Sequence, residues 1–527
     1  MKTNIYSLPE EVLIHVFQYL DVPDRLVAGL VCKKWLCATD CRRLMNEVTC
    51  DVPPDAPSRK ALLFGMSRQF HHFRFSTGVV DDIVVRFLKE FREQLFSLTF
   101  LSCPLDAGIP PSSIPELKIP SCDHLQFLSI QDCDVLCLFT ELPSLTYLRL
   151  YSLPCLTDRL VRDLNRTMPH LRTFKLMAEV TCDSRVYKRY YYKREETFAT
   201  APSDIIFSFP ALKDFLRRRG ATLRCLDVTK TDLPPRAVVE LSRIRGLRLE
   251  KVLFNPDLSA NRIVDFCHAQ RHLNFLDLSK ILSVSDESVR SICDLLKDLR
   301  DLTITFKHRV NESVRDIFQL QGLRRLNLNF CAKISRSSFR EAVSATRITG
   351  LEHLNLGFTS IDNDTLCTLL RQNGNITHLD LTYTRVSDAS LGVVCSSLTR
   401  LRCLIIAYCS RITDCGLTGE AECDAPMDEA DASAAAEAMD VDVDGPSDNP
   451  RAVDVDPCAS LSNLKELESL DIRENSQITM NGCVKAIRFR HLTKLRLDDR
   501  FKFDESFAAK MREQNPALRD WQGACRK

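Results

Sequence analysis

The chain contains 527 residues, of which 45% are hydrophobic and 27% charged, so it is longer than one compact core needs. No uncharged apolar run approaches the roughly 18 residues of a membrane span, and the first residues show no signal-peptide pattern, so we expect neither membrane insertion nor secretion. The 23 cysteines are odd in number and scattered, which favours a reducing compartment over a disulfide-rich secreted scaffold.

The first 48 residues are predicted to form a small helical module. Pro9 is tolerated in the first turn of a helix, where its missing N–H would have no partner within the helix. Apolar residues then recur at the spacing of amphipathic helices, at Val12, Leu13, Val16, Phe17 and Leu20, and after Pro23 at Leu26, Leu30, Val31 and Trp35. So short a segment cannot bury all these side chains by itself. We therefore expect part of this apolar surface to contact a partner.

Two short motifs mark the ends of this module. They are Leu8-Pro9-Glu10-Glu11 and Val31-Cys32-Lys33-Lys34-Trp35, with Ile14, Phe17 and Leu20 between them. Together they resemble the F-box, which implies docking on an adaptor of the Skp family, with cullin and RING subunits joined through that adaptor. Carried onto this sequence, the adaptor-binding residues are Leu8, Pro9, Leu13, Phe17, Leu20, Val31 and Trp35, with Leu13 and Val16 divided between the module's own core and the interface. The alternative is a pair of helices that merely caps the repeats that follow.

The middle of the chain is built from one repeated pattern, L-x-x-L-x-L, in which Ile, Val or Phe can replace Leu. Clear copies begin at residues 125, 145, 171, 223, 273, 299, 323, 351, 376, 401, 467 and 492, and weaker copies at 95 and 244. The six copies from 273 to 401 are 24–28 residues apart, within the range of about 20–29 for leucine-rich repeats. Alternating apolar residues predict a short strand, and stretches such as residues 286–296 predict an amphipathic helix after it.

No single block of strand and helix can bury its apolar strand face, so the blocks must stack. The predicted fold class is therefore α/β: a short all-α F-box followed by a leucine-rich-repeat solenoid, with a curved parallel sheet inside and helices outside. Cys331 and Cys409 occupy equivalent positions after two of the strands, so both are expected in the core. Over roughly residues 90–515 the pattern resembles the cysteine-containing class of leucine-rich repeats.

The period divides the chain into five predicted segments. They are the F-box module (1–48), a linker and solenoid N-terminal cap (49–90), repeats with a long insertion at about 178–210 (91–419), an acidic insertion (420–457), and terminal repeats with a C-terminal cap (458–527). The first insertion contains residues 187–196, where tyrosines alternate with Lys and Arg. Such a run could bind phosphate or stack on bases, although an exposed loop is the simpler interpretation.

The acidic insertion is strongly negative, whereas the rest of the chain is positive. Residues 420–457 hold 13 of the 70 acidic residues but only one base, Arg451, so the rest of the chain carries a net charge of +13. Because the insertion has almost no large apolar side chains, it is predicted to be disordered. It could mimic a ligand, block the basic body or recruit a basic partner, and a passive solvated insertion is the simplest alternative.

Four aromatic residues recur at one repeat position. Phe330, Phe358, Tyr383 and Tyr408 each stand two residues after the last apolar residue of a strand, so their rings are predicted to form a ladder at one edge of the sheet. Aromatic residues in such a row either grip a partner or simply pack on one another. The predicted substrate-binding residues are these four together with Asp380 and Arg496 from the polar face of the sheet.

The sequence contains no pattern of a catalytic or metal centre. No two cysteines are three residues apart, and the glycine-rich phosphate loops, H-E-x-x-H and G-x-S-x-G are all missing. We therefore predict no catalytic residue, no metal site and no cofactor.

F-box proteins with leucine-rich repeats are substrate receptors of SCF-type cullin-RING ubiquitin ligases. The resemblance implies a non-enzymatic subunit of this kind, cytoplasmic and/or nuclear, whose repeats bind a protein substrate that the sequence does not identify. One alternative is a scaffold or adaptor that does not direct degradation. A second, less favoured, is a nucleic-acid-binding protein that uses the basic body and residues 187–196. No membrane partner is expected.

Overall fold

The structure is a computed structural model. It describes residues 5–522 except 6–7, 47, 67, 77–79, 103–115, 134–135, 154–155, 179–206, 232, 234–236, 257, 307–308, 346–347, 421–458 and 502–503. The predicted insertions at about 178–210 and 420–457 therefore lie almost wholly outside the described residues. The chain divides into two compact units, Met1–Asn255 (unit 1) and Pro256–Lys527 (unit 2). In these described ranges no helix has the length and apolarity that crossing a bilayer requires.

Unit 1 begins with the predicted helical module. Its helices are α1 (Glu10–Phe17), α2 (Val22–Ala28), α3 (Lys33–Thr39) and α4 (Arg42–Met45). The side chain of Asp21 accepts a hydrogen bond from the backbone N–H of Asp24 (2.8 Å) and so caps α2. The core of the module consists of Leu13, Phe17, Ala28, Ala38 and Leu44.

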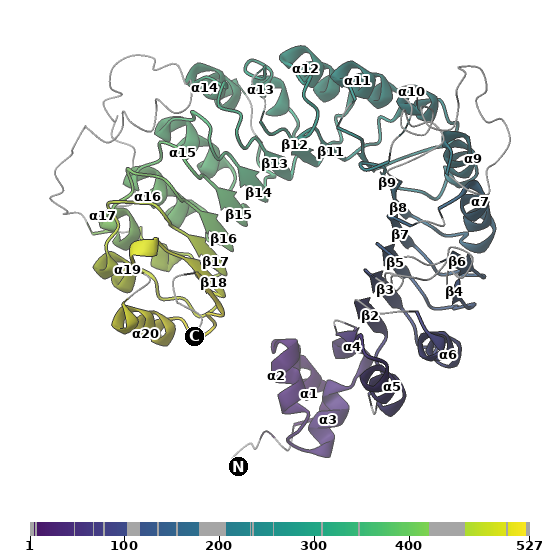
Figure 1. Ribbon diagram of the computed structural model, residues 1–527. Coiled ribbons are helices and arrows are strands. Elements are labelled where there is room, and N and C mark those ends of the chain that lie inside the picture. Colours follow the sequence, from purple (N-terminus) through teal and green to yellow (C-terminus); the bar gives the residue numbers. More distant parts are fainter. Residues whose placement is uncertain are drawn as a thin grey trace. The chain divides into compact units, whose positions relative to one another are not determined.

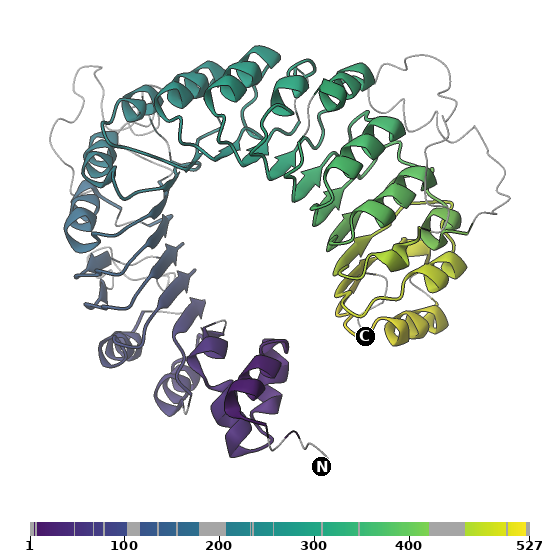
Figure 2. The same cartoon turned by 180° about the vertical axis from the view of Figure 1, so that it is seen from behind.

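A parallel sheet forms the rest of unit 1 (Figure 1). Its strands follow in the order β1 (Thr49–Val52), β2 (His72–Ser76), β3 (Ser97–Leu101), β5 (Phe127–Gln131), β7 (Tyr147–Tyr151), β8 (Thr173–Met177), β9 (Cys225–Asp227) and β10 (Lys251–Leu253). Its helices are α5 (Ala56–Gly65), α6 (Asp82–Glu90), α7 (Asp158–Thr167), α9 (Phe209–Arg219) and α10 (Ala237–Ser242). Figure 2 shows from behind that these helices lie on a single side of the strands.

Residues 49–90 were predicted as a linker and solenoid N-terminal cap. They hold β1 and β2, which pair in parallel with each other, and β2 pairs in turn with β3. The sheet therefore begins at Thr49. Between α6 and α7 a second, two-stranded parallel sheet, β4 (Glu116–Ile119) with β6 (Leu136–Phe139), takes the place of a helix.

Unit 2 repeats the strand-and-helix block with little variation. In chain order its elements are α11 (Ala260–Ala269), β11 (Phe275–Asp277), α12 (Asp286–Leu295), β12 (Asp301–Thr303), α13 (Val314–Ile317), β13 (Arg325–Asn327), α14 (Arg336–Ala345), β14 (His353–Asn355), α15 (Asn363–Gln372), β15 (His378–Asp380), α16 (Asp388–Ser397), β16 (Cys403–Ile405), α17 (Asp414–Thr418), η3 (Leu461–Asn463), β17 (Ser469–Asp471), α19 (Met480–Ala486), β18 (Lys494–Arg496), η4 (Asp499–Phe501), α20 (Glu505–Gln514) and β19 (Asp520–Gln522). The strands β11 to β19 pair in parallel in this order. The predicted fold class of a helical module followed by a parallel sheet with helices is confirmed.

One leucine at the centre of each strand from β11 to β18 sets the register of unit 2. Leu354 pairs with Leu326 on one side and Leu379 on the other, and all three are buried. Across the acidic insertion, Leu404 pairs with Leu470 in the same register. The insertion therefore interrupts the sequence period without interrupting the sheet.

The two cysteines predicted for the core are buried there. The thiol of Cys331 donates to the carbonyl of Ile304 (3.2 Å), and the thiol of Cys409 donates to that of Leu381 (3.2 Å). Burial raises the pKa of Cys409 to about 11, so this thiol remains protonated and unreactive at neutral pH. Cys415, in α17, is disulfide-bonded.

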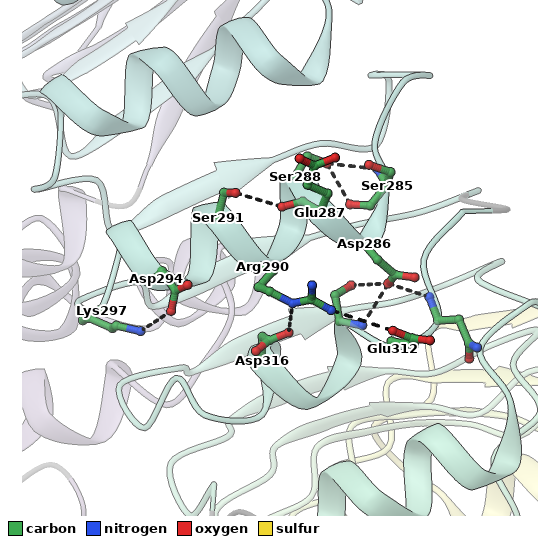
Figure 3. Close-up of polar contacts among 12 residues, drawn as sticks. Ser285, Asp286, Glu287, Ser288, Arg290, Ser291, Asp294, Lys297, Glu312 and Asp316 are labelled. Carbon is green, nitrogen blue, oxygen red and sulfur yellow. Dashed lines mark hydrogen bonds and ion pairs between the residues drawn. The ribbon is translucent and has the colours of Figure 1, made fainter.

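Aspartates at helix N-termini tie successive repeats together. Asp286 of α12 accepts hydrogen bonds from the backbone N–H of Asn311 (2.9 Å) and from the backbone N–H and hydroxyl of Ser313 (2.8 and 2.6 Å). Burial acts to raise its pKa, but these hydrogen bonds outweigh burial and hold the pKa below its usual value. Figure 3 shows this contact beside the ion pair between Arg290 and Asp316 (3.4 Å).

An equivalent aspartate contact joins the repeats on either side of the acidic insertion. Asp414 of α17 accepts from the backbone N–H and the hydroxyl of Thr479 (2.8 and 2.6 Å), 65 residues further along the chain. Gly482 permits this close approach, because a Cβ at that position would overlap the Asp414 carboxylate.

We predict that Gly482→Ala destabilises the protein by about 1–2 kcal/mol, because displacing Asp414 breaks its two hydrogen bonds to Thr479, each worth roughly 0.5–1.5 kcal/mol. This loss exceeds the gain of up to about 1 kcal/mol that alanine gives within a helix. Gly65→Ala is the matched control, since a Cβ there meets nothing within 4 Å. Thermal unfolding of both variants checks the prediction, and equal melting temperatures would contradict it.

Candidate functional site

The N-terminal module exposes an unusual amount of apolar surface. Of the 13 large hydrophobic side chains that are exposed within the described residues, nine lie between residues 5 and 36. They are Ile5, Val12, Val16, Tyr19, Leu26, Val27, Leu30, Val31 and Leu36. Apolar side chains gathered at this density on a small module mark a protein–protein contact.

These side chains form a stripe on each of two helices. Val12, Val16 and Tyr19 follow one another at intervals of four and three residues along and just beyond α1, so they share one side of the helix. The opposite side of α1 carries Leu13 and Phe17 into the core. On α2 and the turn after it, the exposed residues are Leu26, Val27, Leu30 and Val31. We call these two stripes the apolar face of the module.

The structure places two of the predicted adaptor-binding residues in the core of the module. Leu13, which was expected to be divided between core and interface, is 0% exposed, and Phe17 is 2% exposed. Leu8, Leu20 and Trp35 are partly buried and pack against that core. Pro9 and Val31 are exposed, as a contact residue must be.

The sequence prediction did not assign most of the apolar face to the adaptor contact, namely Val12, Tyr19, Leu26, Val27 and Leu30. The signal was present, because α1 carries apolar residues on both of its sides in a module too small to bury both. Helical periodicity does not tell which of two apolar sides turns inward.

A buried arginine fixes the end of α1 against α2. The Nε of Arg25 donates to the carbonyls of Phe17 (3.0 Å) and Leu20 (2.8 Å), and its other nitrogens donate to those of Gln18 (3.1 Å) and Leu44 (3.3 Å). A cation bound to the last carbonyls of a helix also interacts favourably with the helix dipole. Arg25 thereby holds the two stripes in a defined arrangement.

The aromatic residues of unit 2 form the predicted ladder, with one further residue. We call each residue of the ladder a rung. The ring centroids of Phe330 and Phe358 are 3.8 Å apart, those of Phe358 and Tyr383 5.0 Å, and those of Tyr383 and Tyr408 6.4 Å. Phe306, which was not predicted, stacks on Phe330 at 4.4 Å. It follows Ile304 by the same two-residue step, so the repeat pattern already contained this signal. We call these five residues the aromatic ladder.

Every rung of the ladder has a left-handed backbone. The φ angles of the five residues lie between 53° and 58°, a region that costs a residue with a side chain roughly 1–2 kcal/mol. Each rung donates its backbone N–H to the next repeat, as Phe358 does to the carbonyl of Thr382 (2.8 Å) and Tyr383 to that of Ala407 (2.9 Å). These hydrogen bonds and the stacked rings offset the strain. Strained residues of this kind are concentrated at functional sites.

Asp380 and Arg496 lie in the strands β15 and β18, as predicted, and both already have partners within the protein. The carboxylate of Asp380 accepts from the backbone N–H and hydroxyl of Thr382 (3.0 and 2.6 Å) and from the side-chain amide of Asn355 (2.9 Å). It therefore shapes the turn that leads into a rung rather than offering free oxygens to a ligand. Arg496 lies in β18, beyond the strands that precede the rungs, and pairs with Asp471 at 3.9 Å.

Two histidines stack on the sheet face of unit 2. The rings of His353 and His378 are 4.1 Å apart. Burial lowers the pKa of both below the usual value, so both rings are uncharged at neutral pH. Throughout the described part of the chain, no three His, Cys, Asp or Glu side chains gather as metal ligands would. Residues 187–196 lie outside that part.

Comparisons with known proteins agree with this two-part organisation. An F-box-like family model matches residues 5–51. F-box/LRR-repeat protein 12 from Homo sapiens is 25% identical over 314 residues, which cover 55% of this chain and 93% of that protein. The chain combines an F-box-like module with leucine-rich repeats, as F-box and leucine-rich-repeat proteins do. An F-box domain implies, in general, binding to an adaptor of the Skp family.

Two solved structures are similar to this chain at a low level. The complex of TLR13 with ssRNA13 gives a TM-score of 0.38 at 15% identity, covering 87% of this chain and 72% of that one. The complex of Rad7 and Elc1 in yeast gives a TM-score of 0.29 at 18% identity, covering 60% and 82%. Likenesses at this level carry no conclusion about function.

We predict that substitutions in the core and in the apolar face of the module have very different effects on the free energy of unfolding. Phe17→Ala should destabilise the protein by about 3–5 kcal/mol, because it opens a cavity in the core. Leu30→Asp should change stability by less than about 0.5 kcal/mol, because Leu30 is 82% exposed. Urea denaturation of both variants, followed by the fluorescence of Trp35 beside Phe17, distinguishes the two cases. A large loss with Leu30→Asp would place that side chain in the core.

Proposed function

We propose that this protein is the substrate-recognition subunit of an SCF-type E3 ubiquitin ligase, acting in the cytoplasm and/or nucleus. In this proposal the apolar face docks on the Skp-family adaptor, which joins the chain to the cullin and RING subunits. The repeats hold a protein substrate so that it is ubiquitinated by the enzymes of the complex. The chain itself contributes proximity and orientation, not chemistry.

The observation that carries the proposal is the apolar face. Its exposed side chains belong to helices that are otherwise well packed, since Leu13 and Phe17 are buried and Arg25 is bonded to four carbonyls. The face is therefore a stable surface in a folded module. Burial of such side chains against a partner stabilises a complex by roughly 1.5–3 kcal/mol for each large residue.

A scaffold that does not direct degradation is the second candidate, because the same face could hold an adaptor that is not joined to a cullin. The two candidates differ in what is recovered together with the adaptor.

We predict that Leu30→Asp abolishes recovery of the adaptor and cullin when the full chain is affinity-purified from cells and its partners are identified by mass spectrometry. A buried, unpaired carboxylate at the centre of an apolar contact costs several kcal/mol. Leu282→Asp is the matched control, since Leu282 is 88% exposed but lies in unit 2.

The wild type and Leu282→Asp should both recover adaptor and cullin. Proteins retained by all three chains are the substrate candidates. Recovery of the adaptor without any cullin would favour the scaffold, and recovery of cullin with Leu30→Asp would contradict docking through the apolar face.

A further inference from the structure

The aromatic ladder offers ring edges rather than ring faces. From Phe306 to Tyr383 the successive rings are tilted by only 11–13° and their centroids are 3.8–5.0 Å apart. Each of these rings therefore covers the face of its neighbour, and solvent reaches mainly the edges. The edge of an aromatic ring carries the positive part of its quadrupole. A row of such edges attracts apolar groups and anions more readily than cations.

Basic side chains follow the rungs at the same edge of the sheet. Lys333 comes three residues after Phe330, Arg385 two after Tyr383, and Arg411 three after Tyr408. We call these three the basic row. All three are exposed, and the backbone of Arg411 lies beside that of residue 387 in the neighbouring repeat.

Two members of the basic row lack the ion pairs that other exposed arginines form. Arg325 pairs with Asp301 (2.6 Å) and Arg324 with Glu352 (3.0 Å). Among the described residues, no carboxylate lies within ion-pair distance of Arg385 or Arg411.

The charged side chains that act on Arg385 are themselves positive. Burial lowers the pKa of Arg385, and the positive charges of Arg336 and Arg411 lower it further. Like charges held together in this way are stabilised by an anion that binds between them.

The aspartates at this edge are already bonded within the protein. Asp380 accepts from Thr382, and Asp388 accepts from the backbone N–H and hydroxyl of Thr413 (2.8 and 2.7 Å). These two carboxylates are therefore engaged by Thr382 and Thr413 and do not pair with the basic row.

The length of the ladder limits what it can hold. Its four ring-to-ring distances add up to about 20 Å, the length of about six residues of extended chain at ~3.3 Å each. The equivalent position of the next repeat is Glu474, which also has a left-handed backbone. A carboxylate there repels an acidic ligand and so ends the surface.

We propose that the aromatic ladder and the basic row together form the docking site for an extended acidic segment of the substrate protein, about six residues long. Its carboxylates would pair with Arg385, Arg411 and Lys333, and its aliphatic side chains would lie along the ring edges. This inference rests on the proposed function, in which the repeats bind a protein substrate. Single-stranded nucleic acid fits less well, because bases stack on open ring faces and the ladder covers its own.

The test uses fluorescence anisotropy with the full chain and three labelled probes. They are an eight-residue peptide of Asp, Glu, Val and Leu, the same peptide with Asn and Gln in place of the acids, and a 12-nucleotide single-stranded RNA. Arg385→Gln/Arg411→Gln removes the two unpaired charges. Tyr408→Asn removes a rung that is 49% exposed while placing there a residue that tolerates a left-handed backbone. Arg324→Gln/Arg402→Gln is the matched control, since both arginines are exposed and paired with carboxylates.

The acidic peptide should bind more tightly than the neutral peptide and the RNA. The Arg385/Arg411 variant should weaken its binding by at least about tenfold, as the loss of charge-assisted hydrogen bonds predicts. Tyr408→Asn should weaken it severalfold, and the control variant should leave it unchanged. Equal binding by the Arg385/Arg411 variant and the control, or tighter binding of the RNA, would overturn the proposal.

The acidic insertion has the same chemistry as the probe, so every measurement is repeated on a chain in which residues 421–457 are replaced by a short Gly-Ser linker. Binding that appears only after this replacement supports the docking site and identifies the insertion as its competitor. Absence of binding in both chains would overturn the proposal. Adaptor binding, measured in parallel, should be equal in all variants, and its absence from the wild type would count against the proposed function alone.

Discussion

The pairing of one buried leucine per strand with its equivalents in the neighbouring strands is the interaction on which the repeats depend. Because Leu354 stacks in register between Leu326 and Leu379, every other position of the repeat is also brought next to its equivalents. The aromatic ladder is a direct consequence, since its rungs share one position and therefore meet ring to ring. The aspartate contacts between repeats, such as Asp414 with Thr479, preserve this register even across the acidic insertion.

The N-terminal module is subject to the opposite constraint. A module of about forty residues buries one side of α1 and has too few residues to cover the other. The result is a folded module with an apolar face, which makes its association with a partner favourable without a change in its own structure. The two surfaces thus have different physical origins. The apolar face exists because the module is too small to bury all its apolar side chains. The ladder exists because equivalent residues of successive repeats lie side by side.

The sequence predicted the repeated features well and the unrepeated ones poorly. Strand positions, buried Cys331 and Cys409, and the stacking of Phe330, Phe358, Tyr383 and Tyr408 all follow from periodicity. Strand β1 escaped prediction because Cys50 and Val52 take the places of the usual leucines. Phe17 was assigned to the adaptor contact, and Leu13 partly so, because periodicity does not say which apolar side of α1 turns inward. The hydrogen bonds of Asp380 to Thr382 and Asn355 could not be predicted, because they depend on the turn and not on the strand pattern.

Hydrogen–deuterium exchange of the full chain, with and without a purified Skp-family adaptor, tests the central claim most directly. If the apolar face is the docking surface, protection should increase in α1, α2 and the turn that follows α2, while the strands of unit 2 and the turns that carry the aromatic ladder remain unchanged. Protection along the ladder, or no change in α1 and α2 at adaptor concentrations that saturate an F-box, would contradict the assignment of the two surfaces to two different partners.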